Sequence, residues 1–286
     1  MKNLVYVVAV LALMAVGAVA GILIYNAALA GDGEASEEIS APTLDPNVTP
    51  TPGYSQVVAT NEALQTQIAV LQQVTPEPVV TEEITAETPP EETDTAETNS
   101  EGLSGRSLFR IEQTESEVRF NIDETLNGNR ITVVGTTDQV AGDIVVDFDN
   151  PGSSQVGTIR INVRTLTTDN RFRNDALRAR ILRSAEDEFE FAEFTPTDLA
   201  NLPESVSVGD TIEFQITGDL TVRGTTNSVT FDTTVTVVSA DRLEGYATAT
   251  ILYRDFGLVI PDVRSVSDVA DEVILEIEFV ALRVNE

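Results

Sequence analysis

The sequence contains no histidine and no cysteine, and its only lysine is Lys2. Nucleophile systems that pair serine or cysteine with histidine are therefore excluded, and so are zinc, haem and iron–sulfur sites of the usual ligand types. Without cysteine no disulfide can form, so an exported domain must be stabilised by its core. We expect no metal, no cofactor and no enzymatic activity. An enzyme built on carboxylates such as Asp175 or Asp255 is the weakest alternative.

Positive charge is also scarce. The chain has 17 lysine and arginine residues against 47 aspartate and glutamate residues, for a net charge of −30. Binding to nucleic-acid phosphates depends on lysine and arginine, so this balance argues against a nucleic-acid partner. It argues equally against adsorption of the whole chain to an anionic membrane surface.

Residues 1–30 carry a long hydrophobic run, because residues 4–25 contain no charge and are rich in valine, leucine, alanine and isoleucine. As a helix, about 22 residues span roughly 33 Å, which matches a bilayer core of about 30 Å. This length favours a retained transmembrane anchor. The alternative is a signal segment that is cleaved after the A-x-A pattern ending at Ala30.

Orientation follows from Lys2 and the amino terminus, which precede the run and place the rest of the chain outside the cytoplasm. We therefore expect a single-pass protein of the cell membrane with its C-terminal domain outside the cytoplasm. Cleavage near Ala30 would instead give a secreted or periplasmic protein.

Residues 31–105 contain no basic residue and mix glutamate, threonine, proline and alanine. Such a composition has too little apolar surface to offset the entropy lost on folding, and its charges repel one another. We predict a disordered stalk that reaches on the order of 50 Å.

A short island at residues 57–74 interrupts this composition with the three- and four-residue spacing of a coiled coil. The seam positions are Val57, Asn61, Leu64, Ile68 and Leu71. A parallel homodimer is one interpretation. A transient helix is the other, because about two heptads are marginal alone.

Residues 106–286 consist of short segments in which apolar and polar residues alternate. Val118, Phe120 and Ile122 show this period of two, which recurs around residues 144–148 and 273–279. The pattern is typical of an antiparallel sheet with one buried face. About 180 residues fit an all-β fold, an antiparallel eight-stranded barrel. A helical spacing between residues 169 and 183 predicts a short helical insertion.

The most specific stretch is the run GDLTVRGTT at residues 218–226, which predicts a hairpin with its turn at Arg223 and Gly224. It resembles the G-x-L-T-I/V-R/K-G-x-S/T signature of the YceI-like family, the lipocalin-like polyisoprenoid-binding proteins of bacterial envelopes. Further runs resemble motifs of this family in the expected order, and the resemblance covers roughly residues 108–284. These runs are SEVRF (116–120), GDIVVDFD (142–149), RDFGL (254–258) and DEVILEIE (271–278).

One motif departs from the family pattern. Where the family commonly has R-D-x-x-L, this chain has RNDAL at residues 173–177. Asn174 therefore stands in the place of the acid, which puts any role of that acid in doubt.

A barrel of eight strands is either filled by side chains or open for one small ligand. If it is open, its apolar inward positions suit a hydrocarbon chain, and the family resemblance implies an isoprenoid lipid such as a polyprenyl chain or a quinone tail. The candidate lipid-binding residues are Phe120, Ile122, Ile144, Val146, Phe148, Ile161, Phe172, Leu177, Ile181, Phe191, Ile212, Phe214, Ile216, Leu275 and Ile277. The alternatives are a carrier of another amphiphile, such as a fatty acid or its amide, and a cavity-less interaction module on a stalk.

Arg171 and Arg173 are the candidate contacts for a lipid head group, because they belong to the dense arginine cluster within residues 171–183. The alternative is a solvated helix face that pairs with the acids of residues 186–190, since exposed ion pairs of this kind are common and weak. Arg173 is set apart by its place in the RNDAL motif.

Overall fold

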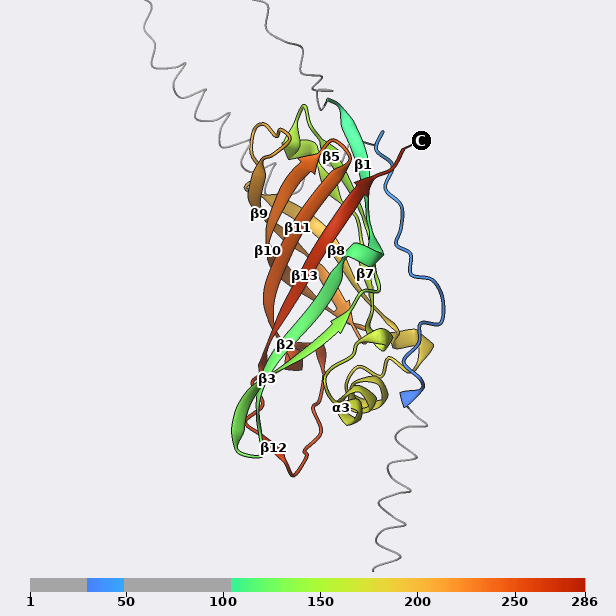
Figure 1. The fold of residues 1–286 in the computed structure, drawn as a ribbon, viewed down its shortest axis with the longest axis vertical. Coiled ribbons are helices and arrows are strands. Elements are labelled where there is room, and N and C mark those ends of the chain that lie inside the picture. Colours follow the sequence, from blue (N-terminus) through green and yellow to red (C-terminus); the bar gives the residue numbers. More distant parts are fainter. Residues whose placement is uncertain (1–29, 49–103, 286) are drawn as a thin grey trace, which may run out of the picture.

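The computed structural model describes residues 30–48 and 104–285. Within these residues, thirteen strands form one antiparallel sheet that rolls into a barrel (Figure 1). The strands are β1 (Arg106–Ile111), β2 (Glu117–Leu126), β3 (Asn129–Thr137), β4 (Val140–Ala141), β5 (Asp143–Asp147), β6 (Gln155–Val156), β7 (Ile159–Asn162), β8 (Phe191–Ala200), β9 (Thr211–Val222), β10 (Thr225–Ser239), β11 (Arg242–Leu252), β12 (Val266–Ser267) and β13 (Glu272–Arg283). The helical elements of the same part are α3 (Arg171–Ala176), the π-helical turn η4 (Leu177–Ile181) and the 3-10 turns η1 (Gln113–Glu115), η2 (Pro151–Ser153), η3 (Val163–Thr165), η5 (Asp187–Phe189) and η6 (Tyr253–Phe256).

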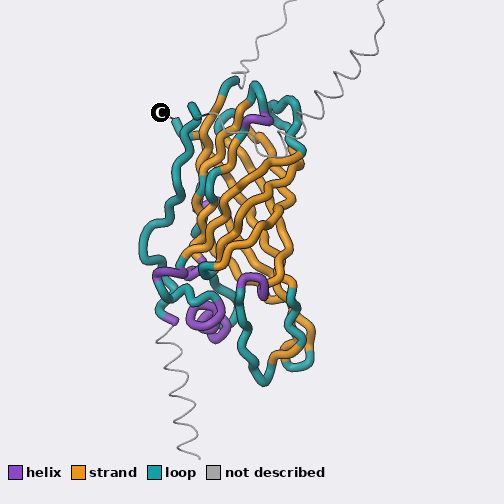
Figure 2. The backbone as a smooth tube through the Cα atoms, turned by 180° about the vertical axis from the view of Figure 1, so that it is seen from behind, coloured by secondary structure: helices purple, strands orange, loops and turns teal. Residues whose placement is uncertain are grey.

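Strand pairing closes the sheet on itself. Neighbouring strands follow the order β7, β8, β9, β10, β11, β13, β1 and β5. Strand β4 pairs with β7, and only Gly142 separates β4 from β5, so this short piece of chain joins the two ends of the order. Figure 2 shows the crossing strands of the barrel from behind. Because side chains alternate along each strand, every second residue points into the barrel.

The all-β antiparallel fold is confirmed, but the predicted count of eight strands is wrong. Turn η1 separates β1 from β2, although both pair with β13. Asp138, Gln139 and Gly142 divide β3, β4 and β5, and Gly157 with Thr158 divides β6 from β7. Long strands in a coiled barrel need such irregularities, because bulges and glycines let the strand bend.

The helical insertion is confirmed as α3 and η4, which together lie across one end of the barrel (Figure 1). Asn170 begins the helix, since its Oδ1 atom accepts hydrogen bonds from the backbone N–H groups of Phe172 and Arg173 at 2.9 and 3.4 Å. Arg183, with φ of 56°, turns the chain away after the π-helical turn. We call this end of the barrel, which also includes the β2–β3 turn and residues 257–271, the α3 end.

The predicted hairpin joins β9 and β10 at the α3 end, with Val222 paired to Thr225. Its two turn residues, Arg223 and Gly224, have φ of 49° and 73°, as a tight two-residue hairpin requires. The Arg223 guanidinium donates to the carbonyl of Ile181 at 2.9 Å and also to the carbonyl of Gly257. The motif thus ties the helical insertion to the segment that follows η6.

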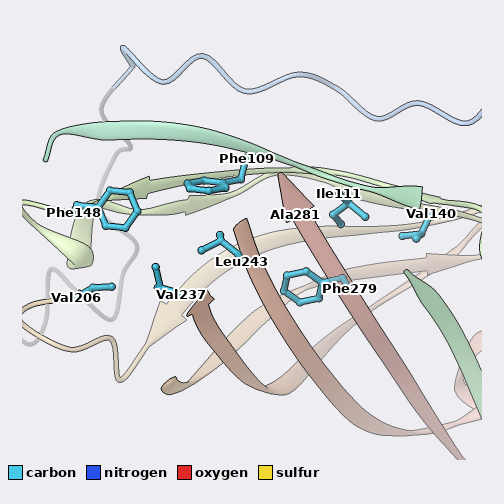
Figure 3. Close-up of a cluster of buried hydrophobic side chains, with 9 residues drawn as sticks. All are labelled: Phe109, Ile111, Val140, Phe148, Val206, Val237, Leu243, Phe279 and Ala281. Carbon is cyan, nitrogen blue, oxygen red and sulfur yellow. The ribbon is translucent and has the colours of Figure 1, made fainter. Parts of the chain in front are cut away.

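One cluster of buried hydrophobic side chains lies toward the opposite end of the barrel, and several of its members also line the cavity described below. Figure 3 shows Phe109, Phe148 and Phe279 among the aliphatic side chains of this cluster. The rings of Phe109 and Phe148 meet edge to face with centroids 6.3 Å apart. Gly245 permits the close approach of Phe279, because a Cβ atom at residue 245 would lie 2.2 Å from that ring.

Residues 30–48 form an extended segment that runs along the outside of the barrel, drawn in blue in Figure 1. We call it the docked segment. The backbone N–H of Ser36 donates to Glu190 at 2.9 Å, and Arg106 donates to the carbonyl of Val48 at 2.9 Å. Ile39 is buried. The expectation of a disordered stalk therefore does not hold for these residues, because the barrel supplies the contacts that the local composition lacks.

Two other predictions concern residues that the structure does not describe. The predicted anchor lies in residues 1–29, and the coiled-coil island at residues 57–74 lies in the gap between the two described ranges. In the described ranges, no helix has the length and apolar character needed to cross a membrane.

Candidate functional site

The barrel encloses a cavity of about 330 Å³, which lies in the size range of ligand pockets. Nearly all of its wall is apolar. Phe214 and Ile216 reach it from β9, Leu275 and Ile277 from β13, and Leu177 from η4. The wall therefore combines side chains from strands far apart in the sequence with one face of the helical insertion.

Most of the predicted lipid-binding residues line this cavity. They are Phe120, Ile122, Ile144, Val146, Ile161, Leu177, Ile181, Ile212, Phe214, Ile216, Leu275 and Ile277. The alternation along the strands places most of them there, because one face of the sheet points inward, and Leu177 and Ile181 come from η4.

Three predicted residues do not line it, each for a different reason. Phe148 comes directly after β5, and its ring packs on Phe109 in the core cluster shown in Figure 3. Phe191 points outward at the start of β8, and Arg160 stacks over its ring at 3.8 Å. Phe172 has 66% of its surface exposed, because the inward face of the helical insertion belongs to Arg173 and Leu177.

Several lining residues were absent from the prediction. Phe231, Val235 and Val237 on β10 carry the same alternation and could have been found by it. Leu258 and Ile260 come from an irregular segment after η6, where no periodic pattern exists to reveal them.

Arg173 and Glu124 form a polar pair in the cavity wall. The Arg173 guanidinium donates to Glu124 at 2.9 Å and to Asp169 at 2.5 Å, and the Arg173 and Glu124 side chains are mostly buried. The charge of the arginine is therefore compensated within the protein. Arg171, the other predicted head-group contact, is exposed and does not line the cavity.

Asn174, which stands where the family pattern has an acid, acts as a hydrogen-bond acceptor. Its Oδ1 atom accepts hydrogen bonds from the backbone N–H and the hydroxyl of Thr168 at 2.8 and 2.7 Å. The amide oxygen holds the chain before α3, which needs an acceptor but no charge.

Glu276 on β13 also borders the cavity, and its carboxylate lies in a hydrogen-bond network with neighbouring strands. Tyr246 donates its hydroxyl to Glu276 at 2.6 Å, and the Asn121 amide donates at 2.7 Å. These hydrogen bonds, with a contribution from Arg119, hold the pKa of Glu276 below its ordinary value. The pKa of Tyr246 is raised, chiefly by burial and then by the adjacent carboxylate.

Within the described residues, the buried side-chain polar atoms that lack a partner belong to Arg106, Ser107, Arg160 and Asp198. None of these residues lines the cavity. The described part also holds no cluster of acids that could bind a metal ion. The wall thus offers apolar surface and polar groups that are already paired, an arrangement that suits binding of an apolar molecule rather than proton transfer.

Solved structures with a similar fold come from bacterial proteins. A polyisoprenoid binding domain from Saccharophagus degradans is 14% identical, with a TM-score of 0.49, over 62% of this chain and 98% of that one. BcnA from Burkholderia cenocepacia is 19% identical, with a TM-score of 0.48, over 59% and 98% of the two chains. The YCEI protein of Campylobacter jejuni is 16% identical, with a TM-score of 0.41, over 53% and 85%.

No curated protein matches the chain. The model of the YceI-like domain matches residues 109–281, which is more than half of the 286 residues. The match spans the strands from β1 to β13 and includes the GDLTVRGTT hairpin and the helical insertion. The chain therefore belongs to the YceI-like family.

Proposed function

We propose that this protein binds or carries an isoprenoid-type lipid, such as a polyprenyl chain or a quinone tail, inside its barrel. The observation that carries the proposal is the cavity of about 330 Å³, whose wall is apolar and whose polar groups are paired. Membership of the YceI-like family supports an isoprenoid over other hydrocarbons. No bond is made or broken, so the protein acts as a binding protein and not as an enzyme.

The energy of such binding comes from apolar burial alone. About 12 tail carbons at about 0.8 kcal/mol each give a gross gain of about 10 kcal/mol. Immobilising the tail consumes part of this gain and leaves affinities of roughly micromolar to nanomolar. Shape and apolarity of the wall are therefore sufficient, without a special anchoring group.

The polar end of the lipid is proposed to lie beside Arg173 and Glu124, the charged pair of the wall near the helical insertion. Since Glu124 and Asp169 already balance the arginine, this site suits a hydroxyl or a quinone carbonyl better than a phosphate. The compartment is proposed to be outside the cytoplasm, either anchored through residues 4–25 or released after cleavage near Ala30.

Lipid extraction tests the proposal directly. The full chain is purified from its own host, extracted with solvent, and the extract is analysed by mass spectrometry. A stoichiometric isoprenoid supports the proposal. A fatty acid or its amide would instead show that the protein carries a lipid of a different class. A chain without lipid that gains no thermal stability from added quinone or polyprenol would refute both, because a ligand that binds only the folded state must stabilise it.

A cavity-less interaction module does not fit the barrel, because its interior is open over about 330 Å³.

A further inference from the structure

The docked segment has a fixed direction along the barrel. It starts beside η4, where Arg178 donates to the carbonyl of Ala30 at 3.2 Å. It ends at the opposite end, where Arg106 and Gln155 each donate to the carbonyl of Val48 at 2.9 Å. Ala30, where the described chain begins, therefore lies at the α3 end (Figure 1).

A buried carboxylate holds this segment in place. Glu190 is fully buried and pairs with Arg164 at 3.0 Å, and Asn162 donates to it at 2.7 Å. Its remaining acceptor positions are occupied by the backbone N–H and hydroxyl of Ser36 at 2.9 and 2.5 Å. Because a buried carboxylate that loses its donors is costly, the barrel strongly favours the bound position of Ser36.

Docking at Ala30 leaves little chain between the barrel and the predicted membrane span. The span ends near residue 25, and the five residues up to Ala30 cover at most about 18 Å when fully extended. The predicted stalk, which would reach on the order of 50 Å, therefore does not stand between the anchor and the α3 end.

The surface of the α3 end matches this placement. Phe172 on α3 and Val259 have 66% and 69% of their surface exposed, and Val263, which follows Val259 on the segment before β12, is exposed as well. Exposed apolar residues of this kind enter the interfacial region of a bilayer, and the neighbouring Arg171 can reach lipid phosphates. Leu258 and Ile260 on the same segment line the cavity.

We propose that the α3 end of the barrel rests on the lipid bilayer that holds residues 4–25, and that the docked segment fixes this orientation. The inference rests on the proposed function for its purpose, since it lets a lipid pass between bilayer and cavity without crossing water. Its geometry depends only on the docked segment and on the predicted anchor.

Single-cysteine labelling tests the orientation without background, because the chain contains no cysteine. Phe172→Cys and Val263→Cys place a fluorophore at the α3 end, and Val208→Cys and Val238→Cys place it at exposed positions of the opposite end. The full chain is reconstituted in phosphatidylcholine vesicles that contain a lipid with a spin-labelled head group. We expect several-fold stronger quenching at residues 172 and 263 than at 208 and 238. Equal quenching at both ends, or none at the α3 end, would overturn the proposal.

A second set of variants tests the role of the docked segment. Glu190→Gln and the milder Ser36→Ala weaken the contact between Ser36 and Glu190, and Glu188→Gln removes the same charge from an exposed neighbour. We expect the difference in quenching between the two ends to shrink in the first two variants and to persist in the third. A difference that survives in Ser36→Ala and Glu190→Gln alike would contradict a fixing role for this segment.

Failure here is distinguishable from failure of the proposed function. Lipid found on extraction together with equal quenching at both ends would refute only the orientation. Strong quenching at the α3 end of a protein that never takes up lipid would refute only the lipid-binding function.

Discussion

At Ile216 a single side chain decides how much of the barrel interior is open. It is buried on β9 and projects into the cavity, whereas Glu213 on the same strand points to solvent. We expect Ile216→Trp to abolish or strongly reduce lipid uptake while the barrel stays folded. Glu213→Trp is the matched control and should bind as the wild type does. Uptake of a labelled polyprenol checks both, and unchanged uptake by Ile216→Trp would argue that lipid does not enter the interior.

Gly245 shows how one missing side chain shapes the packing around it. Since a Cβ atom there would lie 2.2 Å from the ring of Phe279, Gly245→Ala forces either the ring or β11 to move. We expect a loss of about 1–3 kcal/mol in the free energy of unfolding, measured by denaturant titration. In Gly152→Ala the added carbon meets only Asn150 at 3.6 Å, so this control should lose far less. Equal stability of the two variants would show that the aromatic contact is unimportant.

At the scale of elements, the β9–β10 hairpin holds the helical insertion in place through the side chain of Arg223. Removing the Arg223 side chain deletes its hydrogen bonds to the carbonyls of Ile181 and Gly257. We expect Arg223→Ala to cost about 1–3 kcal/mol and to raise amide exchange in η4 before the strands are affected. Hydrogen exchange measured by mass spectrometry checks this, with Arg130→Ala, which breaks only an exposed ion pair, as the control. Amide exchange in η4 that rises equally in both variants would contradict a specific role of Arg223 in stabilising the helical insertion.

The sequence predicts the strands and the β9–β10 turn better than it predicts the irregular segments of the fold. The strands and the turn at Arg223 and Gly224 were predictable, because alternation and positive φ are local requirements. Phe148 points into the barrel as its alternation with Ile144 and Val146 predicts, but its ring packs on Phe109 and does not line the cavity, which local alternation cannot reveal. Leu258 and Ile260 could not be found, because tertiary packing and not periodicity brings their irregular segment to the cavity.

The ordered conformation of the docked segment was not predicted, because the residues that hold it in place are distant in sequence. Residues 31–48 are acidic and rich in small and polar residues, which by themselves favour disorder. The partner that orders Ser36 is Glu190, 154 residues further along the chain. No local pattern records a contact of that kind.

For the molecule as a whole, attachment of the docked segment depends on pH through Glu190. Burial opposes its ionisation, but hydrogen bonds from Ser36 and Asn162 and the charge of Arg164 outweigh this, so the pKa of Glu190 lies below its ordinary value. A carboxyl group whose pKa is lower in the folded than in the unfolded state stabilises the fold at any pH above its unfolded pKa. That stabilisation is lost as the pH falls through the pKa of the folded state. We expect residues 30–48 to be protected against limited proteolysis at neutral pH, measured with a protease active at each pH, and to lose that protection as the pH falls through the lowered pKa of Glu190.

The Glu190→Gln variant provides the control for this pH dependence. Its segment should be less protected at neutral pH and should show little further change on acidification, because the titrating group has been removed. Identical pH profiles in the variant and the wild type would assign the transition to another carboxylate.

The two borders of the undescribed interval lie together, since Arg106 reaches the carbonyl of Val48 at 2.9 Å. The described chain therefore stops at residue 48 and resumes at residue 104 at one place on the barrel. The entropy of closing a flexible loop grows only with the logarithm of its length, so doubling the interval costs about 0.6 kcal/mol. Insertions or deletions between these two borders should therefore leave the barrel and its cavity intact, so the length of the chain between residues 48 and 104 is nearly independent of the fold.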